Sequence, residues 1–132
     1  VLLYPNELLS KVGHITIDFE TELSYNQGLL QPFDSFIVLD GTWRNTRELV
    51  LANSWLAEYP TIGLDNAGES LYRIRQAKLA DSLSSIEALA RVMTLSDSAF
   101  DATRLLRPFI RMIDMQIEYM GQDTYQRNYS KP

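Results

Sequence analysis

Short apolar or alternating runs recur along the chain and predict β-strands. They lie at residues 1–4, 14–19, 36–39, 61–64 and 71–75. The run at 36–39 reads Phe-Ile-Val-Leu without a polar position, which is typical of a strand buried on both faces of a parallel sheet. Gly, Pro, Asp and Asn residues between the runs predict turns, and residues 77–82 are expected to form a loop.

Apolar positions at helical spacing predict four helices between and after these strands. Their expected ranges are 7–12, 43–59, 84–95 and 99–120. Thr42 fits the N-cap of the second helix, and Ser84 with Glu87 fits a capping box for the third. Pro108 is expected to kink the last helix or to restart it.

Two stretches show neither a helical nor an alternating pattern. Residues 20–27 are polar without a clear period, and Gly28, Pro32 and Asp34 then mark a loop. Residues 122–132 form a polar tail that is expected to fray.

The order of these elements predicts an α/β fold, with a mostly parallel sheet flanked by helices. A length of 132 residues fits one domain. No apolar run reaches the ~18 residues that a membrane span needs, so no membrane partner is expected.

Composition removes several kinds of chemistry from consideration. The chain has no Cys, which excludes a disulfide, a thiolate zinc site and a Cys nucleophile within it. The single His, His14, argues against a Ser-His-Asp triad or a multi-histidine metal site. The net charge of −5 arises in residues 1–40, which hold one Lys and six carboxylates. Basic patches elsewhere therefore leave a nucleic-acid partner open.

Four chemically different residues follow the strand predicted at 36–39. In open α/β sheets, ligands bind beyond the carboxyl ends of the strands. Asp40 fits a general base or a ligand for an amine, and Gly41 permits close backbone approach. Thr42 begins a helix whose first N–H groups can hold a carboxylate or phosphate, and Trp43 can stack on a flat ring. The alternative is a turn Asp, a flexible Gly, an N-cap Thr and a core Trp.

Two further segments carry weaker signals. Arg73 and Arg75 alternate on one face of a predicted strand, which suits phosphate or carboxylate binding or, alternatively, a solvated edge strand. The helix that Ser84 begins offers its N-terminus to an anionic group, although the capping box with Glu87 explains both residues without a ligand.

Taken together, these segments resemble the DTW-domain family. Its Asp-x-Thr-Trp motif is similar to Asp40-Gly41-Thr42-Trp43, which is followed here by Arg44-Asn45-Thr46-Arg47. Tyr72-Arg73-Ile74-Arg75 resembles the family's Tyr-x-x-Arg element. Leu83-Ser84-Ser85-Ile86-Glu87-Ala88 resembles its Leu-Ser-Thr-x-Glu-Ala element with Ser in place of Thr, and Leu2-Leu3-Tyr4-Pro5 also matches.

This resemblance implies a single domain over residues 1–132 with a SPOUT-like fold and a C-terminal trefoil knot. It implies a cytoplasmic tRNA-uridine aminocarboxypropyltransferase. The donor would be S-adenosylmethionine, which gives up its 3-amino-3-carboxypropyl group rather than its methyl group. The partner would be tRNA, modified at N3 of a uridine.

The resemblance also implies roles for individual residues. Asp40 would be catalytic, as the base or as the group that holds the donor's amine. Arginines would contact tRNA phosphates or the donor carboxylate, namely Arg44, Arg47, Arg73 and Arg75. Cofactor-binding residues would be Tyr4, Pro5, Leu39, Gly41, Thr42, Trp43, Tyr72, Leu83, Ser84, Ser85 and Glu87. No residue of this sequence is assigned to a metal.

The sequence departs from the family in two ways. Family members carry a Cys cluster, interpreted as a zinc site, and then an acidic segment containing Asn and Thr, and neither is found here. Because the sequence begins with Val1 on a predicted strand, we expect a fragment whose Cys-containing segment and zinc lie upstream. Two alternatives stay open on the same scaffold: a non-catalytic RNA-binding module and an RNA methyltransferase.

Overall fold

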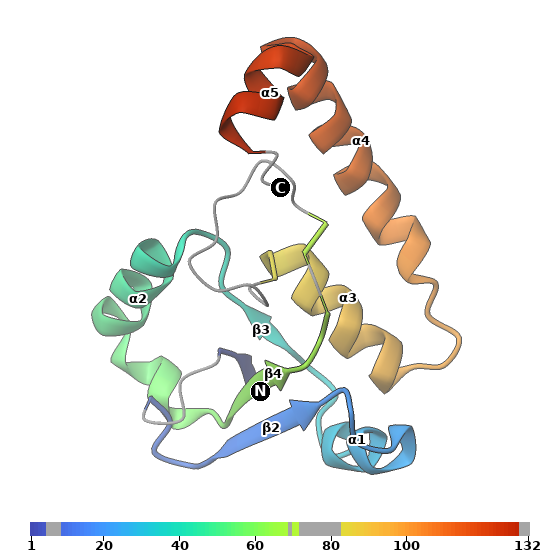
Figure 1. The fold of residues 1–132 in the computed structure, drawn as a ribbon. Helices are drawn as coiled ribbons and strands as arrows, with labels where there is room; N and C mark the ends of the chain where they lie inside the picture. The colour runs from blue at the N-terminus through green and yellow to red at the C-terminus, as the bar shows by residue number, and fades with distance from the viewer. Residues whose placement is uncertain (5–8, 69, 72–82, 130–132) are drawn as a thin grey trace. The chain divides into compact units, whose positions relative to one another are not determined.

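The computed structural model describes residues 1–4, 9–68, 70–71 and 83–129. The chain divides into two compact units, Val1–Ala67 and Gly68–Pro132, whose helices and strands are labelled in Figure 1. Three predictions fall wholly or partly outside the described residues: the start of a helix at 7–12, the strand at 71–75 and the loop at 77–82.

The first unit contains a four-stranded, all-parallel sheet, which confirms the predicted α/β class. Its strands are β1 (Leu2–Leu3), β2 (His14–Asp18), β3 (Ile37–Val38) and β4 (Thr61–Asp65). Their order in the sheet is β2-β4-β1-β3. The register pairs Leu2 with Ile37 on one side and with Thr61 on the other, and it pairs His14 with Thr61.

Burial is greatest on the two central strands of this sheet. Leu2 of β1 and Ile62 of β4 are fully buried. Leu2 and Tyr4 pack with Val50 and Leu56, which lie on α2 (Trp43–Ala52) and on the short 3-10 helix η1 (Ser54–Glu58). These contacts fix α2 against β1 and β3, and they thereby fix the loop that joins β3 to α2.

Residues 36–39 were predicted to form a strand that is buried on both faces. A strand is present, but the prediction that it is buried on both faces is wrong. The strand is shorter, Ile37–Val38, and both residues are only half-buried. Because β3 is the last strand in the sheet order, only one of its edges pairs with a neighbour. The apolar run reflects packing of Ile37 and Leu39 against the α2 side rather than a central position.

The sequence pattern predicts no element at residues 20–27 and a loop at Gly28. The structure instead has helix α1 (Leu23–Leu30) there. Only Asn26 and Leu30 of this helix are buried, so no apolar periodicity marks it. Asn26 instead anchors the helix through a polar contact, since its Nδ2 donates to the Asp18 carbonyl at 2.9 Å.

The helix expected at 7–12 is also not found in its described part, where residues 9–12 form turns and bends. The Ser10 hydroxyl explains this outcome. Its Oγ accepts from the N–H groups of Val12 and Gly13 and donates to the Tyr59 carbonyl at 2.7 Å. A side chain that binds local backbone in this way competes with helix formation.

The single helix predicted over 43–59 is divided into α2 and η1 at Asn53. The Asn53 Nδ2 donates to the Leu49 carbonyl at 2.8 Å, and its Oδ1 accepts from the Trp55 indole at 3.3 Å. Asn53 has φ −124° and ψ 74°, outside the helical region, which ends α2 there.

The second unit is helical in its described part. It contains α3 (Ser85–Ser96), α4 (Ala102–Met120) and α5 (Gln122–Asn128). Buried Phe109, Ile113 and Ile117 of α4 form its core with Ile86 and Tyr125. Helix α4 runs through Pro108 without a restart.

The last helix forms where fraying was expected. Gln122–Asn128 is helical although none of its residues is buried. The Tyr125 ring packs on the α4 core and stacks on Tyr129 with ring centroids 6.1 Å apart. This aromatic contact ties a polar segment to α4, which composition alone does not reveal.

Candidate active site

The carboxyl ends of β1 and β3 lie side by side and bring two predicted site segments together. The register pairs Leu3 with Val38, so Tyr4 and Leu39 follow at the same level of the sheet. Tyr4 is buried and Leu39 is half-buried against the same cluster. Asp40 comes next and is exposed. The site therefore combines an apolar floor with a carboxylate that solvent or a ligand can reach.

Thr42 begins α2 directly beyond this edge, as the sequence predicts. Its side-chain oxygen accepts from the Asn45 N–H at 3.2 Å, and its carbonyl accepts from the Thr46 N–H at 2.9 Å. The backbone N–H groups of residues 43 and 44 precede the first intrahelical bonds. Together with the helix dipole, such groups favour a bound carboxylate or phosphate.

Gly41 is required by the backbone geometry between Asp40 and Thr42. Its φ is +141°, a region that residues with a Cβ rarely adopt. A Cβ built on Gly41 would lie 3.1 Å from the Cβ of Asn45. A side chain at position 41 would therefore be strained by the backbone conformation and would press on Asn45.

Replacing Gly41 with Ala is expected to destabilise the chain by roughly 1–3 kcal/mol, because the residue is strained whatever its neighbours do. The matched control is Gly28→Ala in α1, where nothing lies within 4 Å of an added Cβ. That change is expected to stabilise by roughly 0.5–1 kcal/mol, because Gly28 lies inside a helix. Urea unfolding of both variants measures the difference, and equal effects would contradict the proposed strain.

Two of the predicted anion-binding arginines lie on the exposed side of α2. Arg44 Nε pairs with Glu48 Oε1 at 3.3 Å, and both side chains are mostly exposed. Exposed pairs of this kind contribute little, so the guanidinium can exchange Glu48 for a phosphate at small cost. Arg47 is exposed on the same helix.

The second unit contains the other described site segment, at the start of α3. Ser84 and Glu87 form the predicted capping box. The buried Glu87 carboxylate accepts from the Ser84 N–H at 2.9 Å and from the Ser84 hydroxyl at 2.7 Å. It also accepts from the Ser70 hydroxyl at 2.7 Å and from the Leu71 N–H.

These bonds control the ionisation of Glu87. Burial raises the pKa of a carboxyl group, but the hydrogen bonds from Ser84, Leu71 and Ser70 outweigh that effect and leave the pKa of Glu87 below its ordinary value. With four protein donors on it, the carboxylate holds residues 70–71 and 84 in place. We interpret Glu87 as a positioning residue for Ser84, Ser70 and Leu71.

The predicted site residues thus fall into three groups. The first unit brings together Tyr4, Leu39, Asp40, Gly41, Thr42, Arg44 and Arg47 at one sheet edge. The second unit brings together Leu83, Ser84, Ser85 and Glu87 at the start of α3. Outside the described residues lie Pro5, Tyr72, Arg73, Arg75 and the side chain of Trp43.

Sequence reasoning missed Ser70, whose hydroxyl reaches Glu87 across 17 positions of the chain. No local pattern signals such a contact. Among the described residues, no group of three or more His, Cys, Asp or Glu side chains could hold a metal ion. Within the same residues, no helix is long and apolar enough to cross a membrane.

Comparison with known proteins gives one match. A family model described as the DTW domain matches residues 1–117. That range covers the sheet, the Asp40–Trp43 segment and the start of α3, and it ends within α4. No curated protein and no solved structure matches the chain.

Proposed function

The chain belongs to the DTW-domain family, and from this premise we propose that it modifies tRNA by transferring a 3-amino-3-carboxypropyl group from S-adenosylmethionine to N3 of a uridine. The observation that carries the proposal is the position of Asp40-Gly41-Thr42-Trp43, which joins the carboxyl end of β3 to the start of α2. A SPOUT-like topology with a knot belongs to the same proposal.

The start of α2 suits the amino-acid end of the donor. The backbone N–H groups ahead of Asn45 can hold the donor carboxylate. Asp40 is exposed and shortly precedes them in the chain, and we propose that it pairs with the donor ammonium or accepts a proton. This arrangement of an anion-binding helix end beside a carboxylate matches an α-amino acid group.

The chain has little covalent chemistry to perform in this reaction. The N3 nitrogen of uridine forms a bond to the Cγ carbon of the methionine moiety while the Cγ–S bond breaks. The bonding pair leaves with sulfur, and methylthioadenosine departs as a neutral thioether. The N3 proton passes to a base, for which we propose Asp40. Positioning of the two substrates supplies most of the acceleration, and a placed base adds roughly 10²–10⁴-fold.

Arg44 and Arg47 are proposed to contact tRNA phosphates beside this site. Both are exposed on α2, close in sequence to Asp40. Guanidinium groups bind phosphate oxygens in a bidentate manner, and their contacts set the register of the RNA without reading its sequence.

Binding and consumption of S-adenosylmethionine test the proposal. We expect calorimetry to detect binding to the isolated chain, and we expect the donor to be consumed only when tRNA is added. A non-catalytic RNA-binding module would bind tRNA without consuming the donor. Such a result would contradict the enzymatic assignment and leave the family assignment intact.

A further inference from the structure

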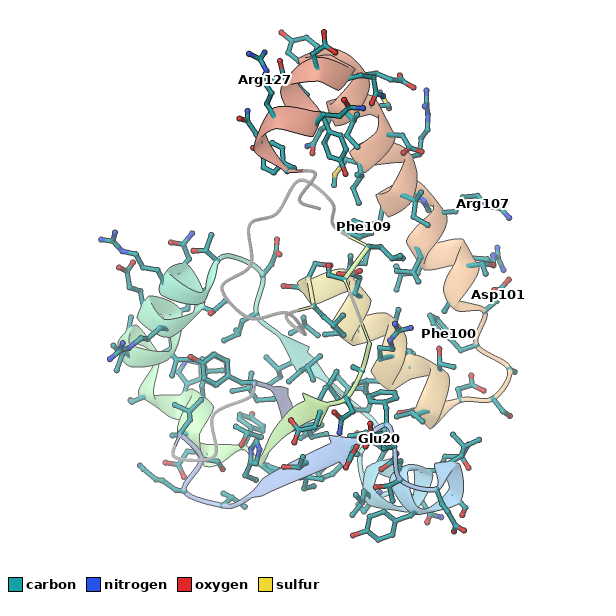
Figure 2. The ribbon with its side chains drawn as sticks, viewed as in Figure 1. Glu20, Phe100, Asp101, Arg107, Phe109 and Arg127 are labelled. Atoms are coloured by element: carbon teal, nitrogen blue, oxygen red, sulfur yellow. The ribbon has the colours of Figure 1, made fainter. Side chains whose placement is uncertain are left out.

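The outward face of α4 carries a row of arginines. Arg104, Arg107 and Arg111 are spaced three and four residues apart, so they lie on one side of the helix. All three are exposed, whereas Phe109 faces the buried core of the second unit. Figure 2 shows Arg107 pointing away from α3 and Phe109 lying on the side of α4 that faces α3.

The positive charge is concentrated in the first half of α4. Residues 102–111 contain three Arg and no Asp or Glu, although the whole chain has a net charge of −5. From Arg104 to Arg111 the helix rises about 10 Å, which is long enough to contact more than one phosphate of a nucleic-acid strand. The positive end of the helix dipole adds to this field.

Asp101 is the carboxylate that precedes this row, as the N-cap of α4. Its side chain accepts from the Thr103 N–H at 3.0 Å, so it is committed to the helix end. Hydrogen bonds from Thr103, followed by the charges of Arg104 and Arg107, hold the pKa of Asp101 below its ordinary value. The N-cap therefore offsets part of the charge of the row, but Arg111 lies almost three turns further along the helix.

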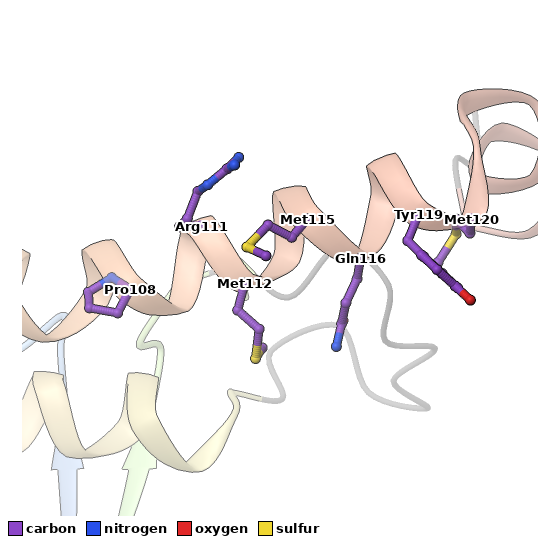
Figure 3. Close-up of a pocket in the computed structure, with 7 residues that line it drawn as sticks. All are labelled: Pro108, Arg111, Met112, Met115, Gln116, Tyr119 and Met120. Atoms are coloured by element: carbon purple, nitrogen blue, oxygen red, sulfur yellow. The ribbon is translucent and has the colours of Figure 1, made fainter.

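An apolar, open hollow continues the same face toward the end of α4. The residues that line it include Arg111, Met112, Met115 and Tyr119, and Figure 3 shows that Arg111 and Met112 extend from different sides of the helix. Tyr119 is 96% exposed and Met115 is 54% exposed. Arg111 reaches Glu118 at 3.4 Å in an exposed pair, which contributes little and can be exchanged.

We propose that this face of α4 binds the tRNA substrate, with Arg104, Arg107 and Arg111 on backbone phosphates and Tyr119 stacked on an unpaired base. The inference rests on the proposed function and adds a second contact surface to Arg44 and Arg47. Clustered guanidiniums next to an exposed aromatic ring are the features that recognise RNA backbone and unstacked bases. Because three guanidinium groups lie along one side of this surface, a polyanion is favoured as its ligand over an apolar helix.

The double variant Arg104→Gln/Arg107→Gln tests the phosphate contacts, because Gln keeps the helix while removing the charges. Fluorescence anisotropy should show tRNA affinity reduced at least tenfold at low salt. The dependence of log affinity on log salt should become shallower by ~0.7–0.9 for each lost contact. The control Lys11→Gln/Arg127→Gln removes the same charge from exposed residues outside α4, and its salt dependence should stay as in the unchanged chain.

Tyr119→Leu tests the stacking contact, since it keeps an apolar side chain and removes the ring. We expect about fivefold or greater weakening at every salt concentration with an unchanged salt dependence. An unchanged chain that binds no tRNA would overturn the proposed function itself. If that chain binds tRNA, and the arginine variant keeps its affinity and salt dependence, the α4 surface alone is overturned. If Tyr119→Leu binds tRNA with unchanged affinity, the proposed stacking of Tyr119 on a base is wrong.

Discussion

Replacing Asp40 with Asn is expected to abolish transfer to tRNA while leaving the fold intact. Asp40 is exposed beyond the end of β3, so an amide of the same shape disturbs no buried contact. Loss of a placed base should lower kcat by roughly 10²–10⁴-fold. The measurement is the rate of methylthioadenosine release with saturating tRNA, with circular dichroism to verify the fold.

Asp34→Asn is the matched control. Asp34 is an exposed carboxylate that precedes β3, at the end of the strand opposite to Asp40, and its Oδ1 accepts from the neighbouring Ser35 hydroxyl at 3.1 Å. Its substitution should leave the rate unchanged. If Asp40→Asn retains near-normal transfer, the catalytic assignment is wrong. A large rise in KM for S-adenosylmethionine with a modest fall in kcat would assign Asp40 to the donor amine rather than to N3 of uridine.

Replacing Glu87 with Gln is expected to lower the free energy of unfolding at neutral pH by about 2–3 kcal/mol. The buried carboxylate accepts from Ser84, Ser70 and Leu71 on its two oxygens, whereas an amide has one acceptor oxygen and cannot accept from all of these donors. Urea unfolding followed by far-ultraviolet circular dichroism is the measurement, because the described part of the second unit is helical.

The same substitution should flatten the dependence of stability on acid pH. The folded-state pKa of Glu87 lies below its ordinary value of 4.5, so the unfolded chain binds its proton more readily. The contribution of Glu87 to the free energy of unfolding is therefore fully present above about pH 4.5. It is lost as the pH falls through the lower folded-state pKa. The unchanged chain should lose more stability than Glu87→Gln over that range.

Glu58→Gln provides the comparison for this prediction. Glu58 pairs with Lys11 at 2.9 Å, but both side chains are more than 60% exposed, at 61% and 69%. Its removal should change stability by less than about 1 kcal/mol. If Glu87→Gln has no larger effect than Glu58→Gln, the positioning role of Glu87 is refuted.

Local signals in the sequence predicted much of the sheet and both helix starts at the candidate site. Alternation of apolar and polar residues predicts the strand at 14–19, and a short apolar run followed by turn residues predicts the strand at 61–64. Thr42 and Ser84 were found because N-caps act within one helical turn. These features depend on residues that are close in the sequence, so the sequence alone is enough to predict them.

Features that depend on distant partners could not be predicted in the same way. Helix α1 is anchored by Asn26 rather than by an apolar stripe, and Ser10 keeps residues 9–12 from forming a helix by binding Tyr59. The edge position of β3 follows from the sheet order, which its apolar run does not encode. The contact between Ser70 and Glu87 likewise arises from the fold of the second unit.

The most direct test of the central proposal is the identity of the two products. The chain is incubated with S-adenosylmethionine and tRNA, and the small molecules and digested nucleosides are analysed by mass spectrometry. We predict equal amounts of methylthioadenosine and of a uridine that has gained a 3-amino-3-carboxypropyl group. Formation of S-adenosylhomocysteine with a methylated nucleoside would contradict the proposed transfer and identify the chain as an RNA methyltransferase.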